Sequence, residues 1–206
     1  MTGTIQREPI EWFDIWIEKA NEEITSRVLL IGDSITKSYF DQVAKHLSGK
    51  AACARGSTSR YIGDPILLAE LSLLFKEYSF SIIQFNNGLH GMDNPDEMYQ
   101  ENLPKVIHFI RSLAPEAKLI WASTTPWRCE GDVSRLHDLN KRVILRNRVA
   151  QEFAAAEAIP INDLYELIGD HPEYYSEDGV HLLENGRKIL ADRTSELILG
   201  ILNDIG

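Results

Sequence analysis

The chain has 206 residues, of which 44% are hydrophobic and 25% are charged, and its formal net charge is -10. A chain of this size and composition can bury one sizeable core, so we expect a single globular domain over residues 1–206. The negative charge argues against nucleic acids and anionic membrane surfaces as partners. No stretch has the roughly 18 to 20 apolar residues of a membrane span, and the N-terminus lacks a signal-peptide pattern. These features predict a cytoplasmic protein without integral membrane association.

The first distinctive segment is the apolar stretch IEWFDIWIEKA at residues 10–20. Its aromatic residues and isoleucines present apolar surface that something has to cover. We expect the protein's own core to cover it, with a partner subunit in a homo-oligomer as the alternative.

Further along the chain, short apolar runs alternate with longer amphipathic stretches. The runs predict buried strands at 28–31, 81–85 and 118–122, and weaker strands at 51–53 and 159–162. The amphipathic stretches predict helices at 96–115, 136–156 and 185–201. This alternation is typical of an α/β protein, a three-layer α/β/α sandwich of flavodoxin-like type with a central, mostly parallel sheet of about five strands.

Small and polar residues follow four of these strands. The segments are GDS after Ile31, ARGSTS after Cys53, NNGLHG after Phe85 and STTPWR after Ala122. In open α/β sheets, ligands bind outside the carboxyl ends of the strands. We therefore expect the four segments to converge on one functional rim.

Ser34, in the first of these segments, has two interpretations. Asp33 or Ser34 could simply cap the next helix, because both residue types accept hydrogen bonds from free N–H groups at helix starts. Alternatively, Ser34 is a nucleophile at the head of a helix, where the dipole and free N–H groups favour developing negative charge. A serine hydroxyl needs a base and a group that orients the base, so the second interpretation requires a histidine and a carboxylate elsewhere.

The segment YYSEDGVHLLENGRKILADR, residues 174–193, supplies both groups. Asp178 and His181 are three residues apart just before a predicted helix, so a short turn can place the carboxylate against imidazole Nδ1 and leave Nε2 for Ser34. Among the other histidines, His90 in NNGLHG is the serious alternative as the base.

In combination, these motifs resemble the SGNH/GDSL hydrolase superfamily of esterases and lipases, with matching blocks from Gly32 to His181. The resemblance implies the SGNH-hydrolase type of α/β sandwich, with Ser34 as nucleophile, His181 as base and Asp178 as the residue that orients the base. It also implies an oxyanion hole made by the N–H groups of Ser34 and Gly56 and by an asparagine amide. The sequence departs here from the common G-x-N-D pattern, so Asn86 is preferred for the amide and Asn87 remains the alternative.

This resemblance implies a serine esterase that forms an acyl-enzyme and needs neither a metal nor another cofactor. Short acyl groups such as acetyl on a carbohydrate or another polar alcohol are the expected substrates, with a lysophospholipase or thioesterase as an alternative. A catalytically silent carbohydrate-binding protein of the same fold is a further alternative. The residues expected to line the substrate pocket are Asp33, His90, Thr125, Trp127 and Arg128. The two cysteines, Cys53 and Cys129, lack metal-site or redox-motif spacing and are predicted to be ordinary thiols.

Overall fold

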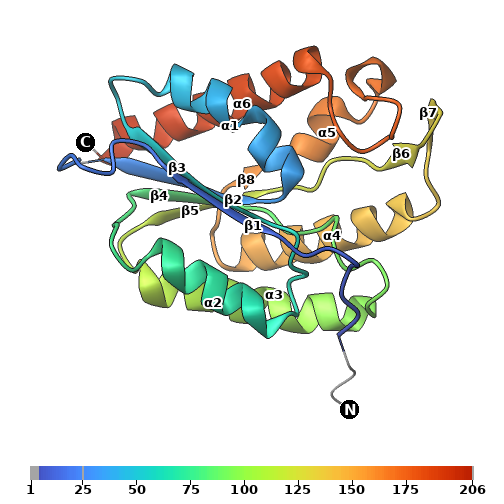
Figure 1. Cartoon of the computed structure of the whole chain (residues 1–206), viewed down its shortest axis with the longest axis horizontal. Helices are drawn as coiled ribbons and strands as arrows, with labels where there is room; N and C mark the ends of the chain where they lie inside the picture. The colour runs from blue at the N-terminus through green and yellow to red at the C-terminus, as the bar shows by residue number, and fades with distance from the viewer. Residues whose placement is uncertain (1–4, 25, 206) are drawn as a thin grey trace.

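The computed structural model describes residues 5–24 and 26–205, and it contains one six-stranded sheet between two layers of helices (Figure 1). The strand order is β1-β3-β2-β4-β5-β8. All neighbouring strands are parallel except β1, which pairs with β3 in the antiparallel direction. The strands are β1 Phe13–Ile17, β2 Arg27–Gly32, β3 Ala52–Thr58, β4 Ile82–Phe85, β5 Lys118–Ala122 and β8 Ile161–Asn162. The predicted three-layer α/β fold is confirmed.

Helices α2, α3 and α4 cover one face of the sheet, and α1, α5 and α6 cover the other (Figure 1). Strand β2 is buried throughout, and its side chains alternate between the two resulting cores: Leu29 and Ile31 join the first, Val28 and Leu30 the second. The helices are α1 Ser34–His46, α2 Pro65–Leu74, α3 Asp96–Leu113, α4 Asn140–Ala156, α5 Leu164–Ile168 and α6 Glu184–Ile205. None of the helices in the described part of the chain is long and apolar enough to cross a membrane.

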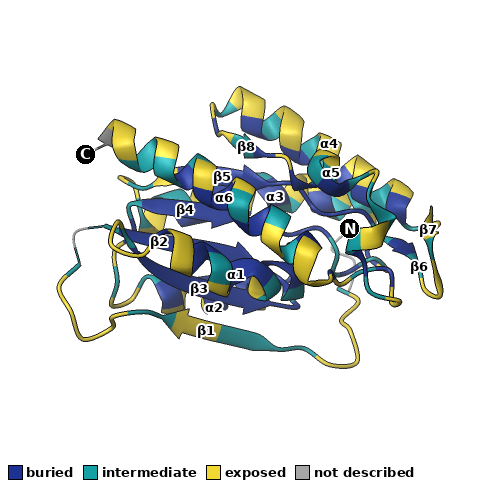
Figure 2. Ribbon diagram, turned by 90° about the horizontal axis from the view of Figure 1, so that it is seen from above, coloured by how far each residue is buried: buried dark blue, intermediate teal, exposed yellow. Residues whose placement is uncertain are grey.

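The sheet has one strand more than expected, because the N-terminal apolar stretch forms the edge strand β1. Phe13 and Ile17 pack against the core, whereas Ile15 and Trp16 are exposed on the edge of the sheet (Figure 2). The protein's own core therefore covers only part of this apolar surface.

Two predicted boundaries are wrong in ways that affect the site. Strand β3 continues to Thr58, well past the predicted end at residue 53, because it pairs with β2 as far as Ser57 and with β1 as far as Thr58. The helix expected over 136–156 begins only at Asn140. The residues before it form a small hairpin of β6 Arg128–Cys129 and β7 Asp132–Leu136 at the carboxyl end of the sheet.

Candidate active site

Ser34 lies where strand β2 ends and helix α1 begins. Asp33 is the N-cap of α1, and its Oδ1 accepts a hydrogen bond of 2.9 Å from the Ile35 N–H. Gly32 allows the first turn of α1 to lie close to the end of β2, because a Cβ atom at position 32 would be only 2.1 Å from the Thr36 hydroxyl oxygen. Ser34 is thus the first residue of the helix, and its own N–H has no hydrogen-bond partner among the described residues.

His181 approaches Ser34 from the loop between the short 3-10 turn η1 (Pro172–Tyr174) and helix α6. Its Nε2 lies 2.9 Å from Ser34 Oγ, and its Nδ1 lies 2.7 Å from Asp178 Oδ2. The fold therefore brings Ser34, Asp178 and His181 together, although 147 positions separate Ser34 from His181. Asp33 caps the helix, as the first interpretation of the Gly-Asp-Ser turn expects, and Ser34 faces the imidazole, as the second requires, so the role of Ser34 as a nucleophile stays a prediction.

Asp178 is held as a carboxylate by a dense set of donors. Its Oδ1 accepts hydrogen bonds from the backbone N–H groups of Val180 and His181, both at 2.8 Å, and from the Ser176 hydroxyl at 2.9 Å. Partial burial by itself would raise the pKa of Asp178, but these bonds and the one to the His181 ring outweigh it and lower the pKa. An ionised Asp178 requires Nδ1 of His181 to be the donor, which leaves Nε2 of the neutral ring to accept the Ser34 proton.

The hairpin β6–β7 supports the loop that carries this pair. The N–H of Arg128 donates to the Gly179 carbonyl and the N–H of Gly131 donates to the Glu177 carbonyl, both at 2.8 Å. The Arg128 guanidinium is turned inward, where it donates to the carbonyls of Val133 and Gly169.

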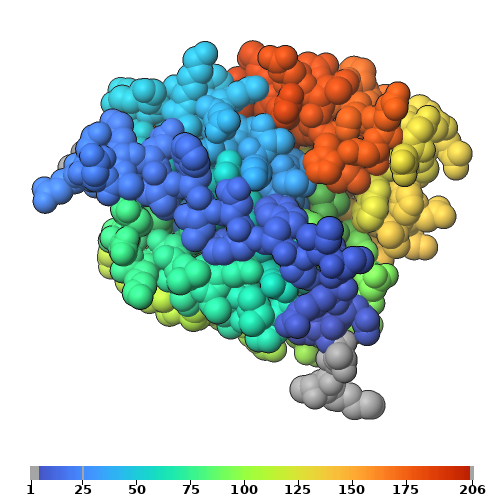
Figure 3. Space-filling model, viewed as in Figure 1, coloured from blue at the N-terminus to red at the C-terminus, as the bar shows by residue number. Residues whose placement is uncertain are grey.

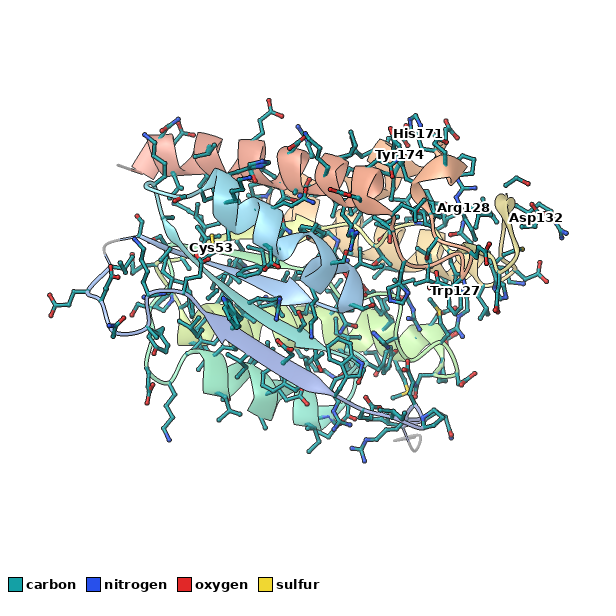
Figure 4. All side chains as sticks on the ribbon, turned by 45° about the horizontal axis from the view of Figure 1, so that its top comes forward. Cys53, Trp127, Arg128, Asp132, His171 and Tyr174 are labelled. Carbon is teal, nitrogen blue, oxygen red and sulfur yellow. The ribbon has the colours of Figure 1, made fainter. Side chains whose placement is uncertain are left out.

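This placement corrects one prediction about Arg128. Its side chain is buried, and its guanidinium also stacks 5.0 Å from the centre of the Tyr175 ring. Figure 4 shows Arg128 at the same end of the molecule as His171 and Tyr174. Arg128 is therefore a structural anchor of the hairpin, and the expected contact with substrate is wrong because the guanidinium is engaged inside the protein.

Asp33 and Thr125 are also buried, at 3% and 2% relative exposure. They line a small internal space of about 10 Å³, together with Asn86 and Leu89, behind the first turn of α1. The expected role of Asp33 and Thr125 in contacting substrate is therefore not supported by their positions. Trp127 differs, since its ring is partly exposed and stacks on His137 with centroids 5.0 Å apart, and its substrate contact stays a prediction.

Gly56 does not lie in the loop after β3, as expected, but inside the strand. It pairs with Ile31 of β2 on one side and with Ile15 of β1 on the other. A Cβ atom at position 56 would lie 2.5 Å from the Leu74 side chain of α2. The sequence placed Gly56 after this strand because it predicted the end of β3 too early. In the structure this glycine allows α2 to pack closely on the sheet, so its assignment to the oxyanion hole is corrected.

The two asparagines after β4 differ in which hydrogen atoms remain free. The Asn86 amide nitrogen donates to the Ala122 carbonyl at 2.8 Å and to the Thr124 hydroxyl at 3.1 Å, so both of its hydrogens are engaged. The Asn87 amide nitrogen donates only to the Arg60 carbonyl, at 2.8 Å. The preference for Asn86 as an oxyanion donor is therefore not supported, and Asn87, the alternative, retains one free N–H.

The segment NNGLHG is held by a residue that sequence analysis missed. Arg146 of α4 is buried, and its guanidinium donates to the carbonyls of Gly88, His90 and Gly91 at 2.8 to 2.9 Å. The same group lies over the rings of Tyr61 and Tyr99. No local signal distinguishes this arginine from the other charged residues of α4, because a charge on an amphipathic helix is usually solvated.

His90 is not in contact with Ser34 in the way that His181 is. Its Nδ1 lies 2.7 Å from Glu8 Oε1, in the segment that precedes β1. The geometry therefore favours His181 over His90 as the base. Within the described residues, no group of three or more His, Cys, Asp or Glu side chains could hold a metal ion, and Cys53 and Cys129 are both free thiols.

Fold and site together define a three-layer α/β protein with a Ser-His-Asp constellation at the carboxyl edge of its sheet. Solved structures with this fold include a carbohydrate esterase family 3 from Talaromyces cellulolyticus, with a TM-score of 0.72 and 16% identity, covering 88% of this chain and 100% of that chain. A GDSL-like lipase from Bacteroides thetaiotaomicron has a TM-score of 0.64 and 18% identity, with 85% and 89% covered. An acetyl xylan esterase has a TM-score of 0.61 and 19% identity, with 84% and 99% covered.

A scan against protein-family models and a search of curated proteins found no match to this chain. At such low identities, the likeness to the solved structures establishes the fold. The predicted resemblance to the SGNH/GDSL hydrolases is thus confirmed for the architecture of the chain.

Proposed function

We propose that this protein is a serine ester hydrolase in which Ser34 is the nucleophile, His181 the general base and Asp178 the residue that orients the base. One observation carries this proposal: His181 contacts Ser34 Oγ through Nε2 and Asp178 through Nδ1, at 2.9 and 2.7 Å. General-base activation of a serine needs an imidazole that is within hydrogen-bonding distance of the serine hydroxyl on one side and of an orienting carboxylate on the other. The names of the solved structures with the same fold, which include esterases and lipases, support the same class of reaction.

In the proposed cycle, Nε2 of His181 takes the Ser34 proton while Ser34 Oγ attacks the ester carbonyl carbon. The resulting imidazolium is stabilised by the Asp178 carboxylate, and the oxyanion is stabilised by the Ser34 N–H and by the free N–H of Asn87. The imidazolium then protonates the leaving alcohol, which produces an acyl-enzyme. Water, deprotonated by the same histidine, releases the acid and restores Ser34.

For the substrate we propose a short acyl group, such as acetyl, on a carbohydrate or another polar, uncharged alcohol. Asp33 directly precedes Ser34, Asp178 lies across the His181 ring from it, and the chain carries a net charge of -10. This field disfavours anionic substrates. A carbohydrate esterase and an acetyl xylan esterase among the structures of the same fold support an acetylated sugar.

The first experiment treats the purified protein with a fluorophosphonate probe and locates the adduct by peptide mass spectrometry. The same preparation is assayed on 4-nitrophenyl acetate, 4-nitrophenyl octanoate and an acetylated xylo-oligosaccharide. We expect an adduct on Ser34 and turnover of the acetyl esters. Ser34→Ala and His181→Ala should each abolish both signals, whereas the matched controls Ser48→Ala and His46→Ala, at exposed positions, should not.

Two outcomes would contradict the proposal. A folded Ser34→Ala protein with normal turnover would exclude Ser34 as the nucleophile. A folded wild-type protein that forms no adduct and hydrolyses none of the esters would favour the carbohydrate-binding alternative, which binding of the unhydrolysed oligosaccharide in calorimetry would then support.

A further inference from the structure

A second histidine and carboxylate pair lies at the same rim as Ser34. His90 Nδ1 and Glu8 Oε1 are 2.7 Å apart although 82 positions separate the residues, and the Trp12 ring meets the His90 ring edge-on, with centroids 6.3 Å apart. Glu8 and Trp12 belong to the segment before β1, and His90 belongs to the loop after β4. This pair is separate from His181, the proposed base, and from Asp178, which orients that base.

The strand order places this contact at the carboxyl edge of the parallel strands. Strand β1 is antiparallel to β3, so its first residue, Phe13, lies beside Thr58 at the carboxyl end of β3. In the order β1-β3-β2-β4, a contact between the segment before β1 and the loop after β4 has to pass over the ends of β3 and β2. Ser34 comes only two residues after the end of β2. The strand order therefore places the Glu8–His90 pair and Ser34 at the same edge of the sheet, where β2, β3 and β4 end.

The N-terminal segment 5–12, which carries Glu8, is held by several hydrogen bonds to the rest of the protein. Arg7 donates to both carboxylate oxygens of Asp64, at 2.7 and 3.1 Å, and the Ser59 hydroxyl donates to Glu11 at 2.6 Å. The backbone of Gln6 exchanges two hydrogen bonds with the Asn94 side chain. In Figure 3 the dark blue atoms of the N-terminal part of the chain lie on the visible face of the molecule, beside green atoms from the middle of the sequence. This attachment holds Glu8 in a defined position.

His90 is held with one ring nitrogen unused. Its side chain is only 18% exposed, Nδ1 is bound to Glu8, and Nε2 has no hydrogen-bond partner among the described residues. Burial lowers the pKa of His90, but Glu8, Asp33 and Glu11 outweigh burial and raise the pKa. Arg146, the cation next to this loop, donates to the His90 carbonyl rather than facing the ring. The acidic groups near the ring thus favour its protonated form, in which Nε2–H has no partner among the described residues.

The oxyanion hole lacks one of its expected donors. Gly56 lies inside β3, and the first residues beyond that strand use their own N–H groups, Ser59 toward the Trp12 carbonyl and Arg60 toward the Thr58 hydroxyl. The loop after β3 therefore offers no free N–H at these positions. A developing negative charge next to Ser34 requires a donor from another element.

We propose that His90 supplies this donor through the Nε2–H of its imidazolium form, and that Glu8 is the positioning residue that orients the His90 ring through Nδ1. The inference rests on the proposed function, because an oxyanion forms only if Ser34 attacks an ester. No proton leaves His90 in this step: the Nε2–H donates a hydrogen bond to the carbonyl oxygen as that oxygen becomes negative. A charged donor gives a stronger bond than a neutral amide.

The test compares His90→Ala, His90→Gln and Glu8→Gln with wild type on 4-nitrophenyl acetate over a range of pH. We expect His90→Ala to lower kcat by roughly 100-fold with little change in KM, as for loss of one oxyanion donor. Glutamine keeps an N–H donor, so His90→Gln should recover part of this loss and should not show the fall in activity that deprotonation of His90 causes at high pH. Glu8→Gln should move that fall to lower pH, because the carboxylate is what raises the pKa of His90.

Glu173→Gln is the matched control, since Glu173 pairs with His171 at 2.9 Å on the surface, outside the site, and its loss should leave the pH profile unchanged. Thermal unfolding of each variant identifies those that fail to fold. A readout independent of turnover is the imidazole ¹⁵N spectrum before and after phosphonylation of Ser34, in which the His90 Nε2–H signal should shift when the phosphonate oxygen occupies the oxyanion site.

The outcomes separate this inference from the proposed function. If wild type is labelled and active but folded His90→Ala has normal kcat and the His90 signal does not move, the inference is overturned and the proposed function stands. If folded wild type is neither labelled nor active, the proposed function fails and the inference fails with it.

Discussion

The backbone N–H of Arg128 donates to the carbonyl of Gly179 at 2.8 Å, which joins the β6–β7 hairpin to the loop that carries Asp178 and His181. Gly179 is two residues from His181, so any displacement of the hairpin is passed to the imidazole. The position of the proposed base therefore depends on a hairpin that follows a different strand, β5.

Gly179 should be intolerant of a side chain. Its φ is +72°, and a Cβ atom there would lie 2.2 Å from the Arg128 carbonyl oxygen, which is backbone and cannot rotate away. We expect Gly179→Ala to lower the free energy of unfolding by about 2 kcal/mol or more, from the left-handed conformation plus the clash, and to reduce kcat sharply. Urea unfolding and turnover of an acetyl ester measure both effects.

Gly131, in the turn of the same hairpin, is the matched control. Its φ is +75°, but nothing lies within 4 Å of its Cβ position. Gly131→Ala should therefore cost only the conformational penalty of about 1 kcal/mol and leave kcat close to wild type. Equal losses of kcat in the two variants would refute the view that the contact with Arg128 positions the catalytic loop.

Arg128→Ala should act on stability rather than on substrate binding. It removes two hydrogen bonds from a charged donor to the carbonyls of Val133 and Gly169 and the stacking on Tyr175, so we expect a loss of about 3 kcal/mol. Arg128→Lys should recover only part of it, because an ammonium group lacks the planar fork. A raised KM with unchanged unfolding would instead restore the substrate contact expected from the sequence.

Asn86 and Asn87 should respond differently to removal of the amide. Asn87→Ala removes the free donor and is expected to lower kcat roughly 100- to 1,000-fold with the fold intact. Asn86→Ala leaves the buried Ala122 carbonyl and Thr124 hydroxyl without their partner, so its first effect should be a loss of stability of about 1 to 3 kcal/mol. Steady-state kinetics and thermal unfolding separate the two effects, and a larger kcat loss for Asn86→Ala in a stable protein would reverse the assignment.

Asp178 should contribute to stability in a pH-dependent way. Its pKa is lower in the folded protein than the value of about 3.9 for an unfolded aspartate, so its contribution is present above that value and is lost as the pH falls towards the folded pKa. The difference in unfolding free energy between wild type and Asp178→Asn should therefore be largest near neutral pH and shrink below about pH 4. Turnover of Asp178→Asn at neutral pH should fall less than that of Ser34→Ala, since the backbone still orients the ring in part. A stability difference that stays constant across this range would contradict the lowered pKa.

The sequence by itself determined the layers of the fold and the three residues that meet at the rim. Apolar runs such as 28–31 and amphipathic periodicity such as 96–113 depend only on local spacing, and strand ends at the carboxyl edge collect the functional residues of an α/β sheet. Ser34 follows from the motif at the end of β2, and Asp178 and His181 follow from the D-x-x-H spacing just before the last helix, so their convergence could be expected.

Only the tertiary structure decided which polar groups remain free to act. Arg128, Asp33, Gly56 and Asn86 have suitable chemistry and suitable places in the sequence, but partners far along the chain engage them or cover them. Conversely, Glu8 reaches the rim only because β1 is added to the sheet in the antiparallel direction. Residue type and spacing say which bonds a side chain can make, whereas packing between distant segments determines which of these bonds are already made.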